Sequence, residues 1–517
     1  MGDGAGRSPV AVRRGQLSAH PTECRWSAVR SDPRGRALLI RVSPHGTIVW
    51  FRQDLRLHDN SALAAACARR GWVLPVYILS DEEEGDWRAG GASRWWLHQS
   101  LSSLARSLTF RGSRLLLFKG NASMLLPRIA RDTGADAVYW NRRYEPAVIA
   151  RDGALKGALR AADLGAESFN GSLLAEPWDV RSPSDKPYRM FTPFRRRLLE
   201  RLQLPPALST PRKLTAPPAW PAARALDELE LMPAIPWHER MQNHWTPGET
   251  AAMRRARKFL ASRVRGYAES RNLPADDGTS ALSPHLHFGE LSVRQLWRWG
   301  ERSTKGWPES AFASELIWRE FAHHLLFYQP RTPLEPLDPQ FEKFEWRTSK
   351  SHQKAWQRGL TGFPIVDAGM RQLWALGWMH NRVRMIVASL LIKNLRQPWL
   401  DGARWFWDTL VDADLANNTL NWQWTAGCGA DAAPYFRIFN PITQGQKFDP
   451  DGDYVRRWVP ELAELPADCI HEPHLAPATV LAAANVRIGK TYPAPRVNLK
   501  TSRLEALEAY RSMRSMR

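Results

Sequence analysis

The sequence predicts a mixed α/β protein in which an N-terminal, Rossmann-like parallel-sheet domain is joined by a long linker to an all-helical domain. Three observations support this. Short β-rich apolar runs alternate with helix-like segments up to about residue 175, residues 176 to 245 are crowded with proline, and apolar residues then recur at spacings of three and four. Alternating strands and helices are typical of a parallel sheet, and the later spacing is that of helices.

Residues 1 to 44 are rich in Arg, Ser, Gly and Pro and show no sustained hydrophobic period. A segment of this composition cannot bury enough apolar surface to offset the entropy of folding. We therefore expect residues 1 to 44 to be disordered, or to precede the native start of the protein, and to carry no fold.

The predicted α/β domain spans residues 45 to 175. Its strands are expected at the apolar runs TIVWF at 47, WVLPVYIL at 72, RLLLF at 114 and DAVYW at 136. Helix-like stretches separate these runs, which is the pattern of βαβ units. No GxGxxG motif follows the first run, so the sequence disfavours a nicotinamide-binding sheet.

The predicted linker spans residues 176 to 245, where stretches such as PPAL and TAPPAWPAA interrupt regular structure and predict a connector over the surface. The predicted helical domain spans residues 246 to 517. Segments such as ASELIWREFAHHLL and PIVDAGMRQLWALG have the spacing of amphipathic helices.

The composition narrows the class of function. There are 72 basic and 52 acidic residues, a net charge of +20, which indicates a polyanionic partner, either nucleic acid or an anionic membrane surface. No run of 18 or more apolar residues occurs, so we expect no membrane-spanning helix. The 4 cysteines are scattered without a CxxC motif, which favours the reducing cytoplasm, and we predict no metal site.

Tryptophan is unusually frequent, with 25 residues, most of them in or after the proline-rich stretch. Core packing accounts for most of them. Tryptophan is also well suited to stacking on nucleic-acid bases and to transferring single electrons, and the sequence alone leaves these alternatives open.

Six motifs in the same order resemble those of the photolyase/cryptochrome family, with most similarity to class I cyclobutane pyrimidine dimer photolyases. They are FRQDLRLHDN at 51, GTSALSPHLHFGELS at 278, ELIWREF at 315, GWMHNRVRMI at 377, DADLANNTLNWQW at 412 and DAAPYFRIFNP at 431. The resemblance covers about residues 46 to 495. It implies that the helical domain is catalytic and holds FAD in a bent, U-shaped form.

The resemblance also implies which residues bind FAD. The residues that match the family's diphosphate-binding stretch are Tyr267, Thr279, Ser280, Ala281, Leu282 and Ser283. Arg384 and Asp412 match an ion pair beside the isoalloxazine, with Asp414 close by. Asn418 matches the position that faces the reactive nitrogen of the central flavin ring, where a neutral amide suits anionic reduced flavin (FADH⁻) better than a carboxylate would.

A lesion pocket is expected on the same helices. Glu315, Trp318 and Arg319 stand at i, i+3 and i+4 and so share a helix face, and the spacing is the same for Asn381, Arg384 and Met385. By resemblance, the residues that contact the dimer or wall its pocket are Glu315, Asn381, Met385, Trp318 and Trp424. The residues expected to meet DNA are Arg271, Arg319, Arg382 and Gln444.

A tryptophan relay and an antenna chromophore are further implications of the resemblance. Trp422, Trp399 and Trp346 match a relay that carries electrons between the surface and the flavin. Some relatives bind a folate antenna through an Asn-Glu pair, but the segment YEPAVIARD at 144 has Ala147 and Val148 there. A folate, a deazaflavin or no second chromophore therefore stays open.

The sequence thus predicts a light-dependent DNA repair enzyme that splits cyclobutane pyrimidine dimers by electron transfer from excited, reduced FAD. We expect it to act on UV-damaged DNA as a cytoplasmic monomer with no obligate protein partner and no membrane contact. Relatives that repair (6-4) photoproducts carry histidines where this chain has Asn381 and Met385. Two alternatives are a cryptochrome-type photoreceptor without repair activity and a nucleic-acid-binding protein that has lost its photochemistry.

Overall fold

The computed structural model describes residues 29–31, 37–39, 45–432 and 436–516. The chain divides into two units, Met1–Pro44 and His45–Arg517. In the first unit, β1 (Val29–Ser31) and β2 (Ala37–Leu39) pair as an antiparallel ladder. The rest of the segment predicted to be disordered lies outside the described residues.

The second unit begins with a five-stranded sheet in which every pairing is parallel. Its strands are β3 (Gly46–Phe51), β4 (Trp72–Leu79), β5 (Leu116–Lys119), β6 (Ala137–Asn141) and β7 (Gly165–Phe169). The spatial order is β5-β4-β3-β6-β7, so the chain moves outward on one side of β3 and then crosses to the other side. Counted from β3, this order is 3-2-1-4-5, that of the first five strands of a Rossmann fold, and the predicted Rossmann-like parallel sheet is confirmed.

Helices cover both faces of the sheet. On one face, α1 (Ser61–Ala68) and α2 (Gly91–Thr109) bury apolar side chains against alternate residues of β3 and β4, such as Val49 and Val73. On the other face, α3 (Ala122–Thr133) and α4 (Pro146–Ala161) pack against the intervening residues, such as Ile48 and Leu74. Burial on both faces explains why β3 and β4 are apolar along their length rather than alternating.

The proline-rich connector is more regular than the sequence predicted. It contains α5 (Phe191–Arg201), α6 (Glu239–His244) and short 3-10 turns. Helix α5 tolerates Pro193 because this residue lies in the first turn, where a backbone N–H would have no partner within the helix. The irregular part follows the edge of the sheet domain, where the Arg224 N–H donates to the Leu117 carbonyl of β5 at 2.9 Å.

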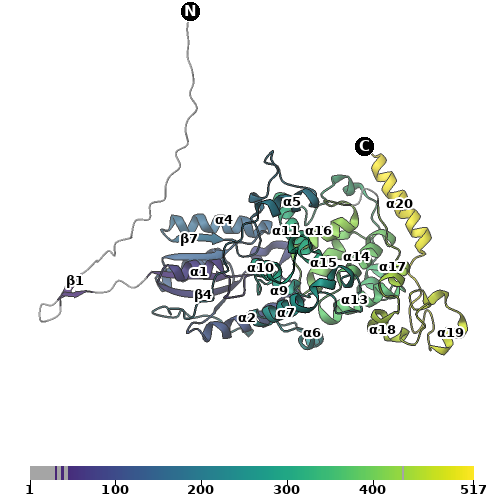
Figure 1. The fold of residues 1–517 in the computed structure, drawn as a ribbon, viewed down its shortest axis with the longest axis horizontal. Coiled ribbons are helices and arrows are strands. Elements are labelled where there is room, and N and C mark those ends of the chain that lie inside the picture. The colour runs from purple at the N-terminus through teal and green to yellow at the C-terminus, as the bar shows by residue number, and fades with distance from the viewer. Residues whose placement is uncertain (1–28, 32–36, 40–44, 433–435, 517) are drawn as a thin grey trace, which may run out of the picture. The chain divides into compact units, whose positions relative to one another are not determined.

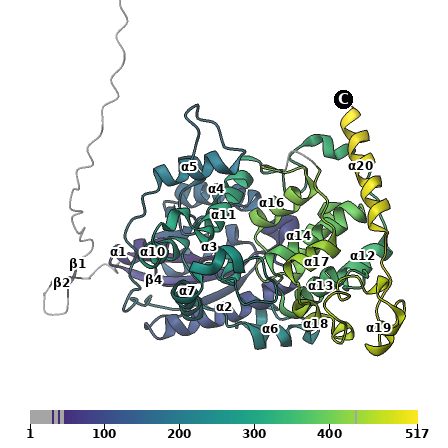
Figure 2. The same ribbon diagram turned by 45° about the vertical axis from the view of Figure 1, so that its right-hand side comes forward.

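The remaining chain is helical, and its only bridge among the described residues is the isolated pair Ile488 and Tyr492. Figure 1 shows α7 to α11 beside the sheet domain and α13 to α20 beyond them, and Figure 2 shows the same arrangement from a second side. The helices are α7 (Glu249–Ser262), α8 (Tyr267–Ser270), α9 (Ser283–His287), α10 (Val293–Ser303), α11 (Ala311–Tyr328), α12 (Lys350–Gln357), α13 (Pro364–Leu376), α14 (Asn381–Ser389), α15 (Trp399–Thr409), α16 (Leu415–Ala426), α17 (Pro441–Phe448), α18 (Asp453–Trp458), α19 (Ala478–Ala483) and α20 (Leu499–Ser515).

The motif FRQDLRLHDN joins the sheet domain to the helical domain. Arg56 is 1% exposed, and its guanidinium donates to the carbonyls of Gly289 at 2.8 Å, Gly171 at 2.7 Å and Asp59 at 2.9 Å. Gly289 belongs to the helical domain and Gly171 follows β7. This one buried side chain therefore joins the two domains.

Among the described residues, every helix is too short or too polar to cross a membrane.

Candidate functional site

The predicted diphosphate-binding segment forms a tight turn against α8. A Cβ on Gly278 would lie 2.6 Å from the Ser270 carbonyl oxygen, so only glycine lets the segment approach this closely. Ala281 has a φ of 47°, in the left-handed region that L-residues rarely adopt, and the Ser280 hydroxyl accepts from the Leu282 N–H at 3.3 Å. This geometry turns Thr279 and Ser280 into a cavity of about 310 Å³.

That cavity is positively charged. Its basic side chains come from α7 and the residue after it, and they are Arg254, Arg255, Lys258 and Arg263, against one acid, Asp277. The sequence analysis missed this basic wall, although the run RRARKFLASR from 254 to 263 carries the signal. Hydroxyls and several cations around one cavity suit a diphosphate.

Tyr267 and the end of the segment lie beside this cavity rather than in its lining. Tyr267 is buried, and its ring packs edge-on against Phe259 and Phe312 at centroid distances of 5.7 and 5.2 Å. Burial raises the pKa of its hydroxyl, so the phenol stays protonated. Leu282 is buried in the core, and Ser283 is the first residue of α9 and is exposed.

A second pocket brings together residues that the sequence places in α14, α15 and α16. Of the predicted site residues, it is lined by Asn381, Arg384, Met385, Asp412, Asp414, Asn418 and Trp422. Arg384 donates to both carboxylate oxygens of Asp412 at 2.9 and 3.1 Å and to the Met379 carbonyl at 2.8 Å. The predicted ion pair is therefore formed and its guanidinium is held from two sides.

Asn418 is positioned by close contact between α15 and α16. Its amide donates to the Ala403 carbonyl at 3.0 Å, and the residue lines the pocket. Gly402 permits this contact because a Cβ there would lie 2.2 Å from the Trp422 ring. The pair Gly402 and Trp422 was not predicted, because the contact joins two helices.

Asp414 is the centre of a buried charge cluster that the sequence analysis also missed. It caps α16 by accepting from the Asn417 N–H at 2.9 Å, and it lies 3.4 Å from His323 and 3.8 Å from His287. Burial acts to raise the pKa of Asp414, but the two histidines outweigh it and hold the pKa well below its ordinary value. Burial acts to lower the pKa of His323, but Asp414 outweighs it and the pKa lies above its ordinary value.

Glu315 and Arg271 form an ion pair at 2.7 Å. Burial raises the pKa of the Glu315 carboxyl above its ordinary value, although Arg271 acts in the opposite direction. A carboxyl that protonates more readily than usual can both accept hydrogen bonds and donate one, which suits contact with the polar edge of a base.

Arg382 lies in a cluster of cations beside this pair. It donates to the Asn272 side chain at 2.6 Å and to the Met385 sulfur at 3.8 Å. Burial and the positive charges of Arg271 and Arg437 lower the pKa of Arg382. The structure thus groups Arg271 and Arg382 with Glu315 and Met385, and their contacts with a lesion or with DNA stay a prediction.

Other predicted residues are spread more widely. The Trp318 ring stacks on Phe191 of α5 at a centroid distance of 3.7 Å, and the Trp424 indole donates to the Asp431 carbonyl at 3.2 Å. Arg319 points inward and donates to the Ser172 carbonyl at 2.9 Å, so this side chain is already engaged within the protein.

Gln444 lies half-buried on α17.

The three predicted relay tryptophans share one hydrophobic core. Trp422 and Trp399 are 3% and 5% exposed, and Trp346 packs at the edge of the same core. Exposure therefore increases from the residue that lines the pocket toward the surface. The nearest ring partners of Trp422 are Phe406 at 5.0 Å and Trp356 at 6.2 Å.

The residues present fit FAD, since a basic, hydroxyl-lined cavity suits the diphosphate and an amide beside an ion pair suits the ring. Models of known families match the chain as "DNA photolyase" over residues 47–217 and "FAD binding domain of DNA photolyase" over residues 312–512. A deoxyribodipyrimidine photo-lyase of Agrobacterium fabrum is 49% identical over 483 residues, which are 92% of this chain and 99% of that protein. The chain belongs to the photolyase/cryptochrome family.

Two further members of the photolyase/cryptochrome family show its breadth. Cryptochrome-2 of Arabidopsis thaliana is 41% identical over 88% of this chain and 77% of that protein. A solved class III photolyase from Agrobacterium tumefaciens superposes with a TM-score of 0.88 at 48% identity, covering 92% of this chain and 99% of that one. The sequence analysis favoured class I, whereas the solved Agrobacterium tumefaciens structure is described as class III, and both classes belong to the family.

Proposed function

We propose that the chain is a deoxyribodipyrimidine photolyase that repairs UV-damaged DNA in light. The observation that carries the proposal is one pocket lined by Asn381, Met385 and Asn418, within a chain that matches the FAD-binding domain of DNA photolyase. Repair requires a lesion base and a flavin in one pocket. Asn381 and Met385 are the predicted contacts of the lesion, and Asn418 is a predicted contact of the flavin.

When held beside Asn418 and the Arg384–Asp412 ion pair, reduced FAD would supply light-driven electron transfer to the cyclobutane dimer with no net redox change. The protein supplies position and a dry pocket. We assign Glu315 and Asn381 to hydrogen bonds with the base edges, and Met385, Trp318 and Trp424 to the walls. The Glu315 contact matters most because charge develops on the base carbonyls it would meet.

The lesion type follows from α14. Repair of a (6-4) photoproduct needs proton transfer, which an imidazole near neutral pH can supply. Asn381 and Met385 stand where relatives with that activity carry histidine, and neither side chain is an acid. Splitting a cyclobutane ring needs no such proton, so we assign the chain to cyclobutane pyrimidine dimers in duplex DNA.

We further propose that the protein acts as a cytoplasmic monomer, with domain boundaries at residues 45–175, 176–245 and 246–517. We also propose a relay through Trp422, Trp399 and Trp346 that recharges oxidised flavin. A second chromophore would be a folate or a deazaflavin. The photolyase of Sulfolobus tokodaii was solved with two FAD molecules, so flavin is a further candidate.

The test is a repair assay on oligonucleotides that carry one defined lesion, under blue light and in darkness. We expect light-dependent repair of a thymine cyclobutane dimer in duplex DNA and none of a (6-4) photoproduct. Robust (6-4) repair would show the lesion assignment to be wrong. Light-dependent flavin reduction with no repair of either lesion would favour the cryptochrome alternative.

A further inference from the structure

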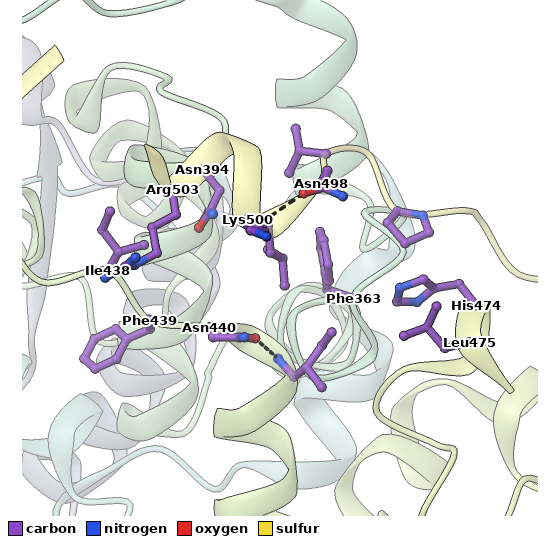
Figure 3. A pocket seen from close by; sticks show the side chains of 14 residues that line it. Phe363, Asn394, Ile438, Phe439, Asn440, His474, Leu475, Asn498, Lys500 and Arg503 are labelled. Carbon is purple, nitrogen blue, oxygen red and sulfur yellow. Dashed lines mark hydrogen bonds between the residues drawn. The ribbon is translucent and has the colours of Figure 1, made fainter. Parts of the chain in front are cut away.

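A large pocket lies away from the flavin and lesion residues, between the start of α20 and the start of α17 (Figure 3). Its volume is about 670 Å³, which is within the range of small-molecule sites. None of the residues that line it is acidic. Neither the flavin nor the proposed lesion contacts explain this pocket.

Two helix N-termini meet at this pocket. Asn498 caps α20 by accepting from the N–H groups of Lys500 and Thr501 at 3.0 Å, and Asn440 caps α17 by accepting from the Ile442 N–H at 2.9 Å. Figure 3 shows both caps facing the same space. The positive ends of two helix dipoles therefore add at one place and favour an anion.

Two cations reinforce this field. Lys500 and Arg503 lie in the first turns of α20 and line the pocket, and both are exposed. Neither forms an ion pair with any residue in the described part of the chain. A phosphate would thus meet an ammonium and a guanidinium that have no internal partner.

An orphaned acceptor favours a ligand that carries a hydrogen-bond donor as well as an anionic group. Asn394 lines the pocket and is 4% exposed, yet its side-chain oxygen has no hydrogen-bond partner among the described residues. The Asn394 amide donates to the Ser502 hydroxyl at 2.9 Å, and this hydroxyl lies 3.4 Å from the Leu499 carbonyl oxygen. An unpaired buried acceptor costs free energy that a ligand with an N–H or O–H donor would recover.

Apart from His474, the remaining wall residues are apolar and can pack against a ring. Phe363 and Leu475 lie opposite Lys500 in Figure 3, and Leu475 is 69% exposed although it is a large apolar side chain. Anion-binding groups, an unpaired acceptor and apolar walls are the three requirements of a nucleoside phosphate. We propose that this pocket binds a nucleoside phosphate, either free or as a nucleotide of a DNA strand outside the lesion site.

The test uses the full chain with FAD bound and two double variants. The pocket variant is Lys500→Ala with Arg503→Ala. The matched control is Lys490→Ala with Arg511→Ala, which removes the same charge from exposed positions outside the pocket. Calorimetric titration with deoxyadenosine 5′-monophosphate tests the free nucleotide, since a purine does not mimic a pyrimidine dimer and the adenine site is filled by FAD.

We expect the nucleotide to bind at least about tenfold more weakly to the pocket variant than to the wild type and the control. We also expect thymidine, deoxyadenosine and inorganic phosphate each to bind the wild type more weakly than the nucleotide does. In a second arm, the affinity for undamaged duplex DNA with single-stranded ends is measured against salt. If the DNA strand is the source, the slope of log K against log salt becomes shallower by about one to two in the pocket variant alone. The proposal would be overturned if the three proteins had the same nucleotide affinity and the same salt slope for DNA, or if both variants lost the same affinity.

Discussion

At the residue scale, most of the proposed chemistry depends on a few side chains whose ordinary properties are changed by burial. Glu315 has a raised pKa and a single cationic partner, Arg271, at 2.7 Å. Trp422 is buried where α15 and α16 touch and lines the pocket that contains Asn418. These two residues allow lesion binding and flavin recharging to be tested separately.

Replacement of Glu315 by alanine should weaken dimer repair. The variant loses a hydrogen bond to a group that gains charge during the reaction, so we expect the affinity for a dimer-containing duplex or the repair yield to fall about tenfold or more. Glu315→Gln should recover part of the loss, because an amide can still donate and accept. Single-turnover repair and binding measurements check this, and an alanine variant with unchanged affinity and yield would remove Glu315 from the lesion contacts.

Replacement of Trp422 by phenylalanine should separate recharging from repair. We expect the variant to lose light-driven reduction of oxidised FAD, because phenylalanine does not transfer single electrons readily, yet to repair dimers once its flavin is reduced chemically. Flavin absorption under illumination measures the first property and repair after dithionite treatment the second. If both fail together while FAD stays bound, the role of Trp422 is structural.

At the scale of elements, α11 shows how one helix serves both domains. Glu315 pairs with Arg271, and Trp318 stacks on Phe191 of α5 in the connector. Glu320 accepts from the N–H of Leu174, which follows the last strand of the sheet, at 2.7 Å. Burial raises the pKa of Glu320 to about 7, against the partly opposing charge of Arg319. We therefore expect the attachment of α11 to the sheet domain to depend on pH.

The expected direction follows from linkage. Because the folded pKa of Glu320 lies above its ordinary value near 4.5, its contribution to stability is greatest below that value and is lost as the pH rises through about 7. Glu320→Gln removes the titration and keeps an acceptor for Leu174. We expect the difference in unfolding free energy, variant minus wild type, to increase by about 2 kcal/mol as the pH rises from about 5 to about 8, as measured by urea unfolding. A constant difference across this range would contradict the assignment.

The cap of α16 should depend on pH in a different way. The pKa of His323 is raised by Asp414, so the stability from this pair is present below the ordinary histidine pKa and lost as the pH rises through the folded one. We expect His323→Gln to be more destabilising in mildly acidic than in alkaline solution, with a faster release of FAD. Denaturation and flavin fluorescence at both pH values check this, and the reverse pH order would contradict it.

The elements also show what a sequence can predict. The parallel sheet and the pocket-lining face of α14 followed from local periodicity, and the family motifs brought Arg384 and Asp412 into the ion pair that the structure shows. The contacts that sequence reasoning missed join distant segments. The engagement of Arg319 with Ser172 depends on how the sheet domain meets α11, and the Asp414 cluster depends on two histidines from α9 and α11. Neither arrangement has a local pattern.

At the scale of the whole molecule, the net charge of +20 gives a measurable expectation for DNA binding. Affinity for undamaged duplex should fall steeply with salt, whereas the extra affinity for a dimer should depend less on salt because it comes from pocket contacts. Removing Arg271 and Arg382 together should make the salt slope shallower by about two, and the control Lys490→Ala with Arg511→Ala should not. Equal affinity for damaged and undamaged duplex at every salt concentration would rule out the lesion pocket.

The buried contacts of Arg56 have a consequence for dissection of the protein. Its guanidinium donates to the carbonyl oxygens of Gly171 and Gly289, which come before and after the connector in the sequence. Gly171 lies within the region matched as DNA photolyase, and Gly289 lies between the two matched regions. A fragment that contained only the helical half would expose the Gly289 carbonyl, and one that contained only the sheet half would leave a buried cation without that acceptor. The two halves should therefore express poorly when cloned apart and should complement each other when produced together, as parts of one cooperative folding unit.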